Sequence, residues 1–458
     1  MPARPRPISR DGDRHSRLNQ SVALTVRASL LLKKLLTDRP PHSHNASVRR
    51  LGLMATCNKL SLIRCQEWQG ILRRMTRNIL SGFTPFPTAL PIAVLVAALV
   101  PTATFGQRTT LVSPELHKDG SVTFRLERPG AHEVLVALAG LEAPLKMTQT
   151  EGVWSVTSAS LASGTYWYSY LVDGKAELDP LNADVIPNYA YLNSVVRVIG
   201  GSQPWEPTDV PHGEVHRHFY ESKVVKGLPG GRSEYFVYTP PGYDARASIS
   251  YPTLYLLHGL SQGAADWTEM GGANFVLDNL IAQGKAKPMV AVMPLGYGDM
   301  AVAAKQPSDP DFGRVFVANN ALFGNVLLTE IVPRVESEYR VTKTREGKAI
   351  AGLSMGGAQS LDIGLNGTGK DGTGEFAWVG GFSSAAPFVR PPAVSGEASK
   401  LRLLWISCGT SDSLLEPNRK LIKELQEKGY AVKAVESPGA HIWPVFQRNL
   451  VDFVQLLF

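Results

Sequence analysis

The stretch "AIAGLSMGGAQSL", Ala349–Leu361, contains the signal that decides the fold of this chain. It reads as a short apolar strand, then a serine between glycines, then small residues that begin a helix. Gly352, Ser354 and Gly356 form the pattern Gly-x-Ser-x-Gly at this junction. The glycines allow a turn so sharp that the serine hydroxyl stands above the sheet edge, at the positive end of the helix dipole. The pattern alone arises often by chance, and an ordinary tight turn is the alternative, but its placement makes Ser354 a candidate nucleophile.

A serine hydroxyl is a poor nucleophile unless a base removes its proton, and the base is itself oriented by an acid. His441, in "SPGAHIWPVF", is the only histidine after Ser354 and lies between the last predicted strand and the last predicted helix. Asp412 follows the preceding predicted strand, in "LLWISCGTSD". We predict that Asp412 orients His441; Glu416 is the alternative acid, but it reads as part of the next helix. Cys408, within the strand, is expected to be a core residue.

Acyl transfer also needs two backbone N–H groups that bind the oxyanion. One is expected from Met355, the residue after the candidate nucleophile. The other is expected from Leu260, on the loop of "LLHGLSQG" that follows an earlier strand. His258 on the same loop is expected to be structural, because such loops use backbone groups rather than an imidazole.

Residues 216–458 alternate apolar strands with amphipathic helices, which is typical of a mostly parallel sheet covered on both faces. Pro333 is expected to break or restart one of these helices. The expected strands are 216–222, 233–244, 252–259, 288–294, 348–353, 377–383, 402–409 and 431–436, and the expected helices are 273–284, 321–340, 415–429 and 443–458.

Residues 107–200 have a different pattern, of short strands separated by turns, which predicts a small all-β sandwich. In "GTYWYSYLVDG", Tyr166, Tyr168 and Tyr170 alternate on one side. Such aromatic alternation usually means that the rings are buried. The alternative is that some rings of this domain are exposed and bind sugar by stacking. Residues 201–215 are rich in Gly and Pro and read as a linker.

Several segments of the second region together resemble carbohydrate esterase family one, which contains feruloyl and acetyl xylan esterases and has enterochelin esterases as relatives. These segments are "VYTPPGYD", "YPTLYLLHGLSQGAADWTEMG", "AIAGLSMGG", "CGTSD" and "GAHIWPVFQRNLVDFVQLLF". The resemblance implies an α/β-hydrolase fold, places Ser354, Asp412 and His441 on the triad positions, and implies no cofactor. The sequence departs from the family at Phe446, where a second Trp is expected.

The first region resembles the immunoglobulin-like early-set domains that are related to glycogen-binding modules and precede many carbohydrate-active catalytic domains. The residues that carry this likeness are Trp154, Gly164, Tyr166, Tyr168, Asp173, Gly174, Asp179, Pro180 and Asn182. The two resemblances imply a serine esterase that removes feruloyl or acetyl groups from plant cell-wall polysaccharide such as xylan. A siderophore trilactone esterase and a non-catalytic carbohydrate-binding protein are the alternatives.

The acyl group depends on the pocket beside the triad. Trp267, Tyr297 and Trp443 lie on or near loops at the expected catalytic edge. They can flank an aromatic acid or simply pack in the core. An aromatic slot would favour ferulate, and a short closed pocket would favour acetate.

The N-terminal residues have the features of an export signal. Residues 75–106 combine Arg77, the apolar run Ala89–Val100 and small residues, which is typical of a secretory signal peptide with cleavage after Gly106 or Ala103. An uncleaved membrane anchor is the alternative, but the apolar run is short for a span. Residues 1–74 read as a basic extension that precedes the true start at Met75, or as a long presequence. The protein is thus expected to be secreted or periplasmic.

Charge and cysteine content limit the partners. Residues 1–74 hold 15 Lys and Arg against four Asp and Glu, so residues 75–458 are mildly acidic within a net charge of +7. This gives no reason to expect nucleic-acid binding. Cys57 and Cys65 lie in the extension, so Cys408 alone cannot form an intramolecular disulfide. The histidines of "HGEVHRH", His212 to His218, lack convincing ligand spacing, and no metal is expected.

Overall fold

In the computed structural model, residues 111–458 are described except for 187, 202, 247, 367–373, 391 and 393–400. The expected basic extension, signal peptide, Cys57 and Cys65 lie outside the described residues.

The region before residue 200 is all-β, as predicted, and its two antiparallel sheets enclose one core. The buried residues of this core include Phe124, Tyr166, Tyr168 and Tyr170, whereas Trp167 is on the opposite face of its strand and is only half-buried. The first sheet has the order β1 (Glu115–Leu116), β2 (Val122–Glu127), β6 (Val153–Thr157) and β5 (Thr148–Thr150). The second has the order β4 (Leu145–Lys146), β3 (Val134–Leu138), β7 (Gly164–Val172), β10 (Asn193–Val198) and β9 (Val185–Ile186), and β8 (Lys175–Glu177) pairs with β7.

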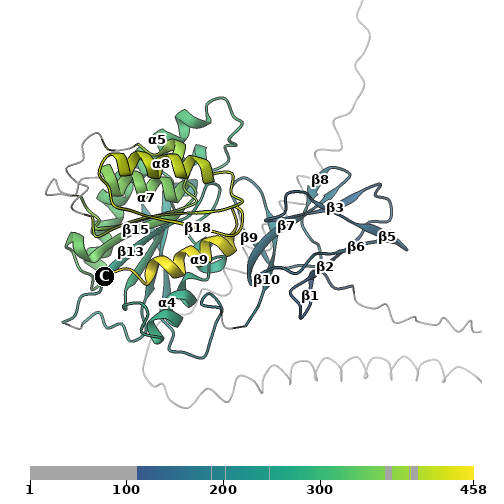
Figure 1. Cartoon of the computed structure of the whole chain (residues 1–458), viewed down its shortest axis with the longest axis horizontal. Helices are drawn as coiled ribbons and strands as arrows, with labels where there is room; N and C mark the ends of the chain where they lie inside the picture. Colours follow the sequence, from purple (N-terminus) through teal and green to yellow (C-terminus); the bar gives the residue numbers. More distant parts are fainter. Residues whose placement is uncertain are drawn as a thin grey trace, which may run out of the picture. The chain divides into compact units, whose positions relative to one another are not determined.

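An eight-stranded sheet forms the centre of the second region (Figure 1). β12 is antiparallel to both of its neighbours, and the strands from β14 to β18 are parallel to one another. The mostly parallel sheet expected from the sequence is therefore confirmed. Its order is β11 (Glu214–Glu221), β12 (Arg232–Thr239), β14 (Val290–Pro294), β13 (Thr253–Leu257), β15 (Lys348–Leu353), β16 (Trp378–Phe382), β17 (Leu403–Gly409) and β18 (Val432–Ser437).

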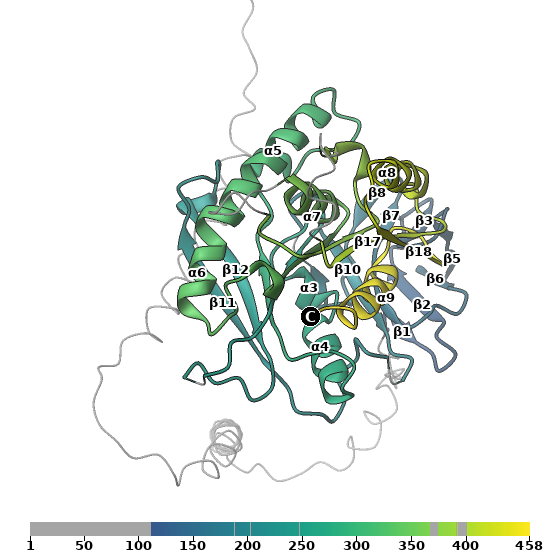
Figure 2. The same ribbon diagram turned by 60° about the vertical axis from the view of Figure 1, so that its left-hand side comes forward.

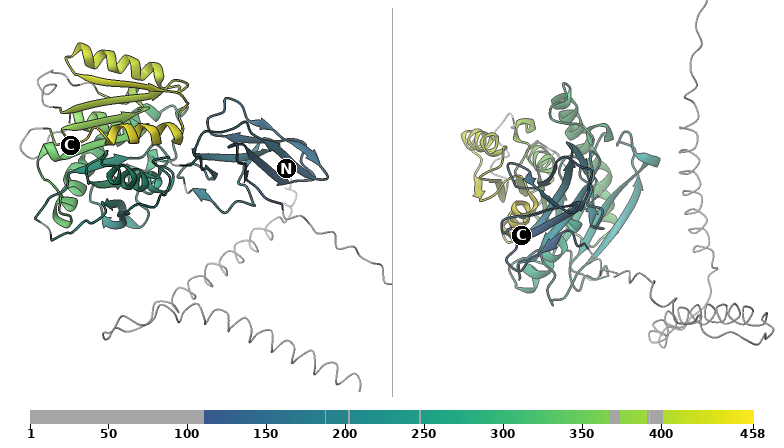
Figure 3. Two further views of the ribbon diagram at one scale, coloured as in Figure 1. Left: turned by 60° about the horizontal axis from the view of Figure 1, so that its bottom comes forward. Right: turned by 90° about the vertical axis from the view of Figure 1, so that its right-hand side faces the viewer.

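Helices cover both faces of this sheet, and each face has its own apolar core. One face carries α5 (Phe312–Val326), α7 (Met355–Asn366) and α8 (Leu415–Glu427), and the other carries α4 (Ala273–Ala282) and α9 (Trp443–Val454). Figure 3 shows α8 and α9 on opposite sides of the C-terminal strands. The carboxyl ends of the parallel strands are thereby held between two packed layers, which is where ligands bind in such sheets.

The helix that was expected to begin at residue 321 is longer than predicted. α5 begins at Phe312, a π-helical turn covers Leu327–Ile331, and α6 (Val332–Glu338) continues in nearly the same direction (Figure 2). Pro333 lies in the first turn of α6, where its missing N–H costs least, and the wider π turn precedes it. The helical run Phe312–Glu338 is long and apolar enough to cross a membrane by length and composition alone, but much of it packs on the sheet.

The segment expected to be a linker is fixed to α4 by hydrogen bonds. The Asn279 amide donates to the carbonyl oxygens of Pro204 and Glu206, at 2.8 Å each. The Asp278 carboxylate accepts from the Gly213 N–H at 2.8 Å and pairs with His212 at 2.9 Å. A glycine- and proline-rich composition therefore marks an irregular segment here, and not a loose one.

Candidate active site

Ser354 lies on the turn between β15 and α7, in a backbone conformation that few side chains adopt. Its φ is 53°, in the left-handed region. A Cβ on Gly352 would lie 2.6 Å from the Gly356 carbonyl carbon, and a Cβ on Gly356 would lie 2.5 Å from the carbonyl oxygens of Leu257 and His258. Both glycines are thus required by backbone packing, and the strain is concentrated at the candidate nucleophile.

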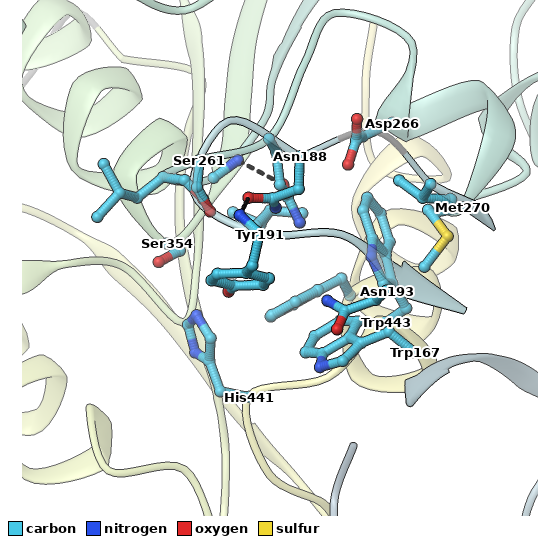
Figure 4. Close-up of a pocket in the computed structure, with 16 residues that line it drawn as sticks. Trp167, Asn188, Tyr191, Asn193, Ser261, Asp266, Met270, Ser354, His441 and Trp443 are labelled. Atoms are coloured by element: carbon cyan, nitrogen blue, oxygen red, sulfur yellow. Dashed lines mark hydrogen bonds between the residues drawn. The ribbon is translucent and has the colours of Figure 1, made fainter. Parts of the chain in front are cut away.

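His441 and Asp412 form a close pair beside this turn. His441 Nδ1 lies 2.7 Å from Asp412 Oδ2, and Asp412 Oδ1 accepts from the Leu414 N–H at 2.9 Å. The Asp412 carboxylate is buried, whereas His441 is partly exposed. With Nδ1–H donated to Asp412, Nε2 is left free, and the imidazole points towards the side of the pocket where Ser354 lies (Figure 4).

The environment of Asp412 favours its charged form. Burial by itself would raise the pKa of this carboxyl, but the hydrogen bond and charge of His441 and the Leu414 N–H lower the pKa below its ordinary value. An ionised Asp412 holds the tautomer in which His441 Nε2 can accept a proton.

The two N–H groups expected to bind an oxyanion lie at the same edge. Met355 is the first residue of α7, so its N–H has no acceptor within the helix. Leu260 lines the pocket with Ser354, and no backbone carbonyl in the described part of the chain accepts from its N–H. Both groups are available to a ligand atom at Ser354.

His258 supports the Leu260 loop from behind. Its ring is buried, with Nδ1 2.8 Å from the Gly259 carbonyl oxygen and Nε2 accepting from the Gly296 N–H at 2.8 Å. Burial lowers the pKa of His258 to about 4, so the ring is neutral at pH 7 and joins the loop after β13 to the loop after β14.

A small pocket of about 120 Å³ opens at Ser354 (Figure 4). Most of its wall is apolar or aromatic, and Asp266 is the only carboxylate among the described residues that line it. The lining residues are Trp167, Ile186, Asn188, Tyr191, Asn193, Gly259, Leu260, Ser261, Gln262, Asp266, Met270, Leu353, Ser354, His441, Trp443 and Phe446. The arrangement can hold an apolar acyl group against a serine, an imidazole and two N–H donors.

Of the three aromatic residues for which pocket lining and core packing were both left open, Trp443 lines the pocket and the other two do not. Trp267 is buried behind Trp443, with ring centroids 5.2 Å apart, and its Nε1–H donates to the Leu257 carbonyl at 2.9 Å. Tyr297 is also fully buried, and its hydroxyl donates to the Gln262 carbonyl at 2.9 Å. Both are packing residues because their polar atoms are used to hold the surrounding loops. Phe446, noted as a departure from the family, does line the pocket and contacts His441 and Trp443.

Residues of the all-β region form part of the pocket wall. This contribution was not predicted from the sequence. Trp167 is on the outer face of β7, Asn193 begins β10, and Asn188 and Tyr191 lie on the loop between β9 and β10. The Tyr189 N–H of this loop donates to the Ser261 carbonyl at 2.8 Å. The outward direction of Trp167 could have been predicted, because it alternates along the strand with the buried tyrosines and so lies on the opposite face.

The Asp266 carboxylate of the pocket wall is almost fully buried. Burial raises the pKa of Asp266 to about 7, against the opposing effect of the Gly263 N–H, which donates to Oδ1 at 3.0 Å. Close to neutral pH this carboxyl therefore exchanges between a charged and a neutral form within the acyl pocket.

The remaining sequence candidates lie away from this chemistry. Burial raises the pKa of the Cys408 thiol to about 11, which keeps it unreactive. Glu416 is exposed in the first turn of α8 and pairs with Arg419. His212 pairs with Asp278, His216 with Glu214, and His218 with Tyr339 and Glu338. Among the described residues no cluster suited to a metal is found.

Curated proteins that match this chain include two named as esterases. The "Endo-1,4-beta-xylanase/feruloyl esterase" of Xylanibacter ruminicola is 26% identical over 354 residues, which is 75% of this chain and 46% of that protein. The chain thus spans about half the length of this relative. The "Acetyl esterase" of Caldicellulosiruptor saccharolyticus is 23% identical over 45% of this chain and 82% of its own.

Solved structures and a family model agree with this fold. The enterobactin esterase FES of Shigella flexneri, solved in the presence of enterobactin, has a TM-score of 0.53 at 18% identity, over 74% of this chain and 94% of its own. This likeness confirms the predicted α/β-hydrolase fold. The model described as "Putative esterase" matches residues 228–457, half of the chain, so the chain belongs to the esterase family.

Proposed function

We propose that this protein hydrolyses feruloyl esters, or esters of similar aromatic acids, on plant cell-wall polysaccharide. The observation that carries the proposal is the aromatic wall of Trp167, Tyr191, Trp443 and Phe446, which meets Ser354 and His441 in one pocket. Rings of this kind offer stacking faces to a planar aromatic acid. The feruloyl esterase activity named for the Xylanibacter relative supports this substrate class.

The reaction proceeds by acyl transfer through Ser354. Its Oγ attacks the ester carbonyl carbon while His441 Nε2 takes the hydroxyl proton, and the Leu260 and Met355 N–H groups bind the oxyanion. Asp412 keeps Nδ1–H in place and stabilises the imidazolium. The tetrahedral intermediate then expels the alcohol, which receives the proton from His441. A water molecule, deprotonated by His441, releases the acid and restores Ser354.

Acetyl esters are the second candidate substrate. The pocket volume of about 120 Å³ is small for a ligand site, and one relative is named an acetyl esterase. A trilactone siderophore is less well supported, because the described residues that line the pocket include no Lys or Arg to bind a strongly anionic substrate. Lys305 and Arg314 are paired with Asp311 instead.

The test compares methyl ferulate and acetylated xylan as substrates for the parent chain and for Ser354→Ala, with the exposed Ser337→Ala as control. Release of ferulate that is lost by about 10⁴-fold or more in Ser354→Ala supports the proposal. Release of acetate alone supports the second candidate. Equal rates in all three proteins would exclude Ser354 as the nucleophile.

Export is part of the same proposal, since the polymer lies outside the cell and residues 75–106 have the composition of a signal peptide. Expression of the full chain in a bacterial host, followed by N-terminal sequencing of the exported product, would locate the cleavage site.

A further inference from the structure

A second, larger hollow adjoins the acyl pocket on the side of His441. It has a volume of about 570 Å³ and is open to solvent. Trp167, Tyr191, Asn193 and His441 line both spaces. The other residues of this groove are Ala137–Glu142, Pro144, Ser169, Ser411, Ala440 and Ile442.

The groove is a built feature, because the all-β region is packed against the catalytic region along its floor. A Cβ on Gly164 of β7 would lie 2.6 Å from Pro444 Cγ of α9. A Cβ on Gly140 would lie 3.1 Å from Ile442 Cδ1. The Ala139 N–H donates to the Trp167 carbonyl at 3.0 Å, which holds the groove's edge on β7.

The chemistry of ester cleavage indicates which part of the ester lies in each of the two spaces. The oxyanion donor Leu260 and the nucleophile Ser354 line the small pocket and are absent from the lining of the groove. The leaving alcohol must lie against His441, which gives it a proton. His441 and its neighbours Ala440 and Ile442 line the groove, so the alcohol side of the ester extends into it.

The groove's surface suits a neutral, hydroxyl-rich alcohol. Trp167 and the exposed Tyr191 and Leu141 offer flat apolar contact for the C–H faces of a sugar ring. Asn193, Ser169 and Glu142 offer hydrogen-bonding groups for its hydroxyls. Within residues 111–458, leaving aside the gaps named above, no Lys or Arg lines the groove, and this lining does not favour an anionic alcohol.

We propose that this groove, formed by the outer face of β7, the segment Ala137–Pro144 and the His441 loop, binds the sugar chain that carries the ester. The proposal rests on the proposed esterase function. In this proposal the all-β region is part of the substrate site itself. Ser169 and Glu142 then determine the preference for esters of oligosaccharides over esters of small alcohols.

The test uses Ser169→Trp, whose indole fills the groove at a position that does not line the acyl pocket. Ser155→Trp, on β6 of the other sheet, is the matched control. The readout is the ratio of kcat/KM for a feruloylated arabinoxylo-oligosaccharide to kcat/KM for methyl ferulate. We expect this ratio to fall at least tenfold in Ser169→Trp and to stay within twofold of the parent in Ser155→Trp. An unchanged ratio in Ser169→Trp overturns the groove proposal.

The outcomes for the groove and for the proposed function are distinguishable. If the parent cleaves acetyl esters only, the same ratio is taken between acetylated xylo-oligosaccharide and 4-nitrophenyl acetate. If no ester is cleaved, the esterase proposal fails, and calorimetric titration with unesterified xylo-oligosaccharide tests the groove directly. Binding that is lost in Ser169→Trp and kept in Ser155→Trp supports the groove, and binding that is equal in both, or absent in the parent, overturns it.

Discussion

The left-handed backbone of Ser354 depends on two residues that have no side chain. Gly352→Ala would place a Cβ 2.6 Å from backbone atoms of Gly356, which cannot move aside like a side-chain tip. We expect esterase activity to fall more than 100-fold and the free energy of unfolding to fall by about 1–3 kcal/mol. Activity assays and urea denaturation would measure both. Gly130→Ala, where a Cβ would have no neighbour within 4 Å, is the control. Normal activity in Gly352→Ala would mean that the turn can relax without losing the site.

Asp266 makes stability depend on pH. Because its pKa is about 7 in the fold and about 4 in the unfolded chain, the folded chain holds a proton between these values that the unfolded chain has lost. Stability therefore falls as pH rises from 4 to 7 and is lowest above 7. We expect Asp266→Asn to be more stable than the parent at pH 8, by roughly 2–4 kcal/mol, and about equally stable at pH 4. Urea denaturation at several pH values would measure this, with the exposed Asp209→Asn as control. If burial does not shift the pKa of Asp266, the free energies of unfolding of Asp266→Asn and the parent will differ by the same amount at every pH.

The three polar residues of the candidate site were chosen from residue types and their order along the chain, and their catalytic roles stay predictions. Ser354, Asp412 and His441 follow strand ends, and strand ends of a parallel sheet meet at one edge. The aromatic residues were less predictable. Trp267 and Tyr297 also lie near that edge, but the direction of each ring is set by hydrogen bonds to the carbonyls of Leu257 and Gln262, which a sequence does not show.

At the scale of elements, the loop after β13 is held in place by one buried ring. His258→Ala removes the links to the backbone of Gly259 and Gly296 and leaves a cavity beneath Leu260. We expect kcat to fall about 10- to 100-fold with little change in KM, because the Leu260 N–H acts on the transition state. Steady-state kinetics would measure this, with exposed His132→Ala as control. A rise in KM at constant kcat would instead assign the loop to substrate binding.

Most elements of the catalytic region were predicted because their apolar runs are long and are ended by Gly or Pro. The start of α5 was missed since Asn319 and Asn320 interrupt its apolar pattern. Both asparagines are buried. Asn319 Oδ1 accepts from the Gly298 and Asp299 N–H groups, so this polar side chain can occupy a position in the core.

At the scale of the whole molecule, the catalytic region and the all-β region share one substrate site. Sequence patterns divide the chain well, because each region has its own periodicity. They do not reveal that Trp167, Asn188 and Tyr191 complete the pocket of a nucleophile far away in the chain. That arrangement depends on contacts such as the Arg197 guanidinium donating to the Glu269 carbonyl at 2.9 Å, which no local pattern encodes.

The connecting segment is therefore expected to contribute to both stability and activity. Asn279→Leu keeps the size of the side chain but removes the donors to Pro204 and Glu206, leaving these carbonyls without their partner. The Asn279 Oδ1 atom also accepts from the Thr208 hydroxyl, so three hydrogen bonds are lost, and the free energy of unfolding should fall by about 2 kcal/mol or more. The substitution should also make trypsin or thermolysin cleave faster within residues 201–215. It should lower kcat/KM, because Trp167 and Tyr191 would be held less firmly at the pocket. Exposed Asn325→Leu on α5 is the control. If cleavage is faster but kcat/KM is unchanged, the all-β region does not need the connecting segment to keep its place at Ser354.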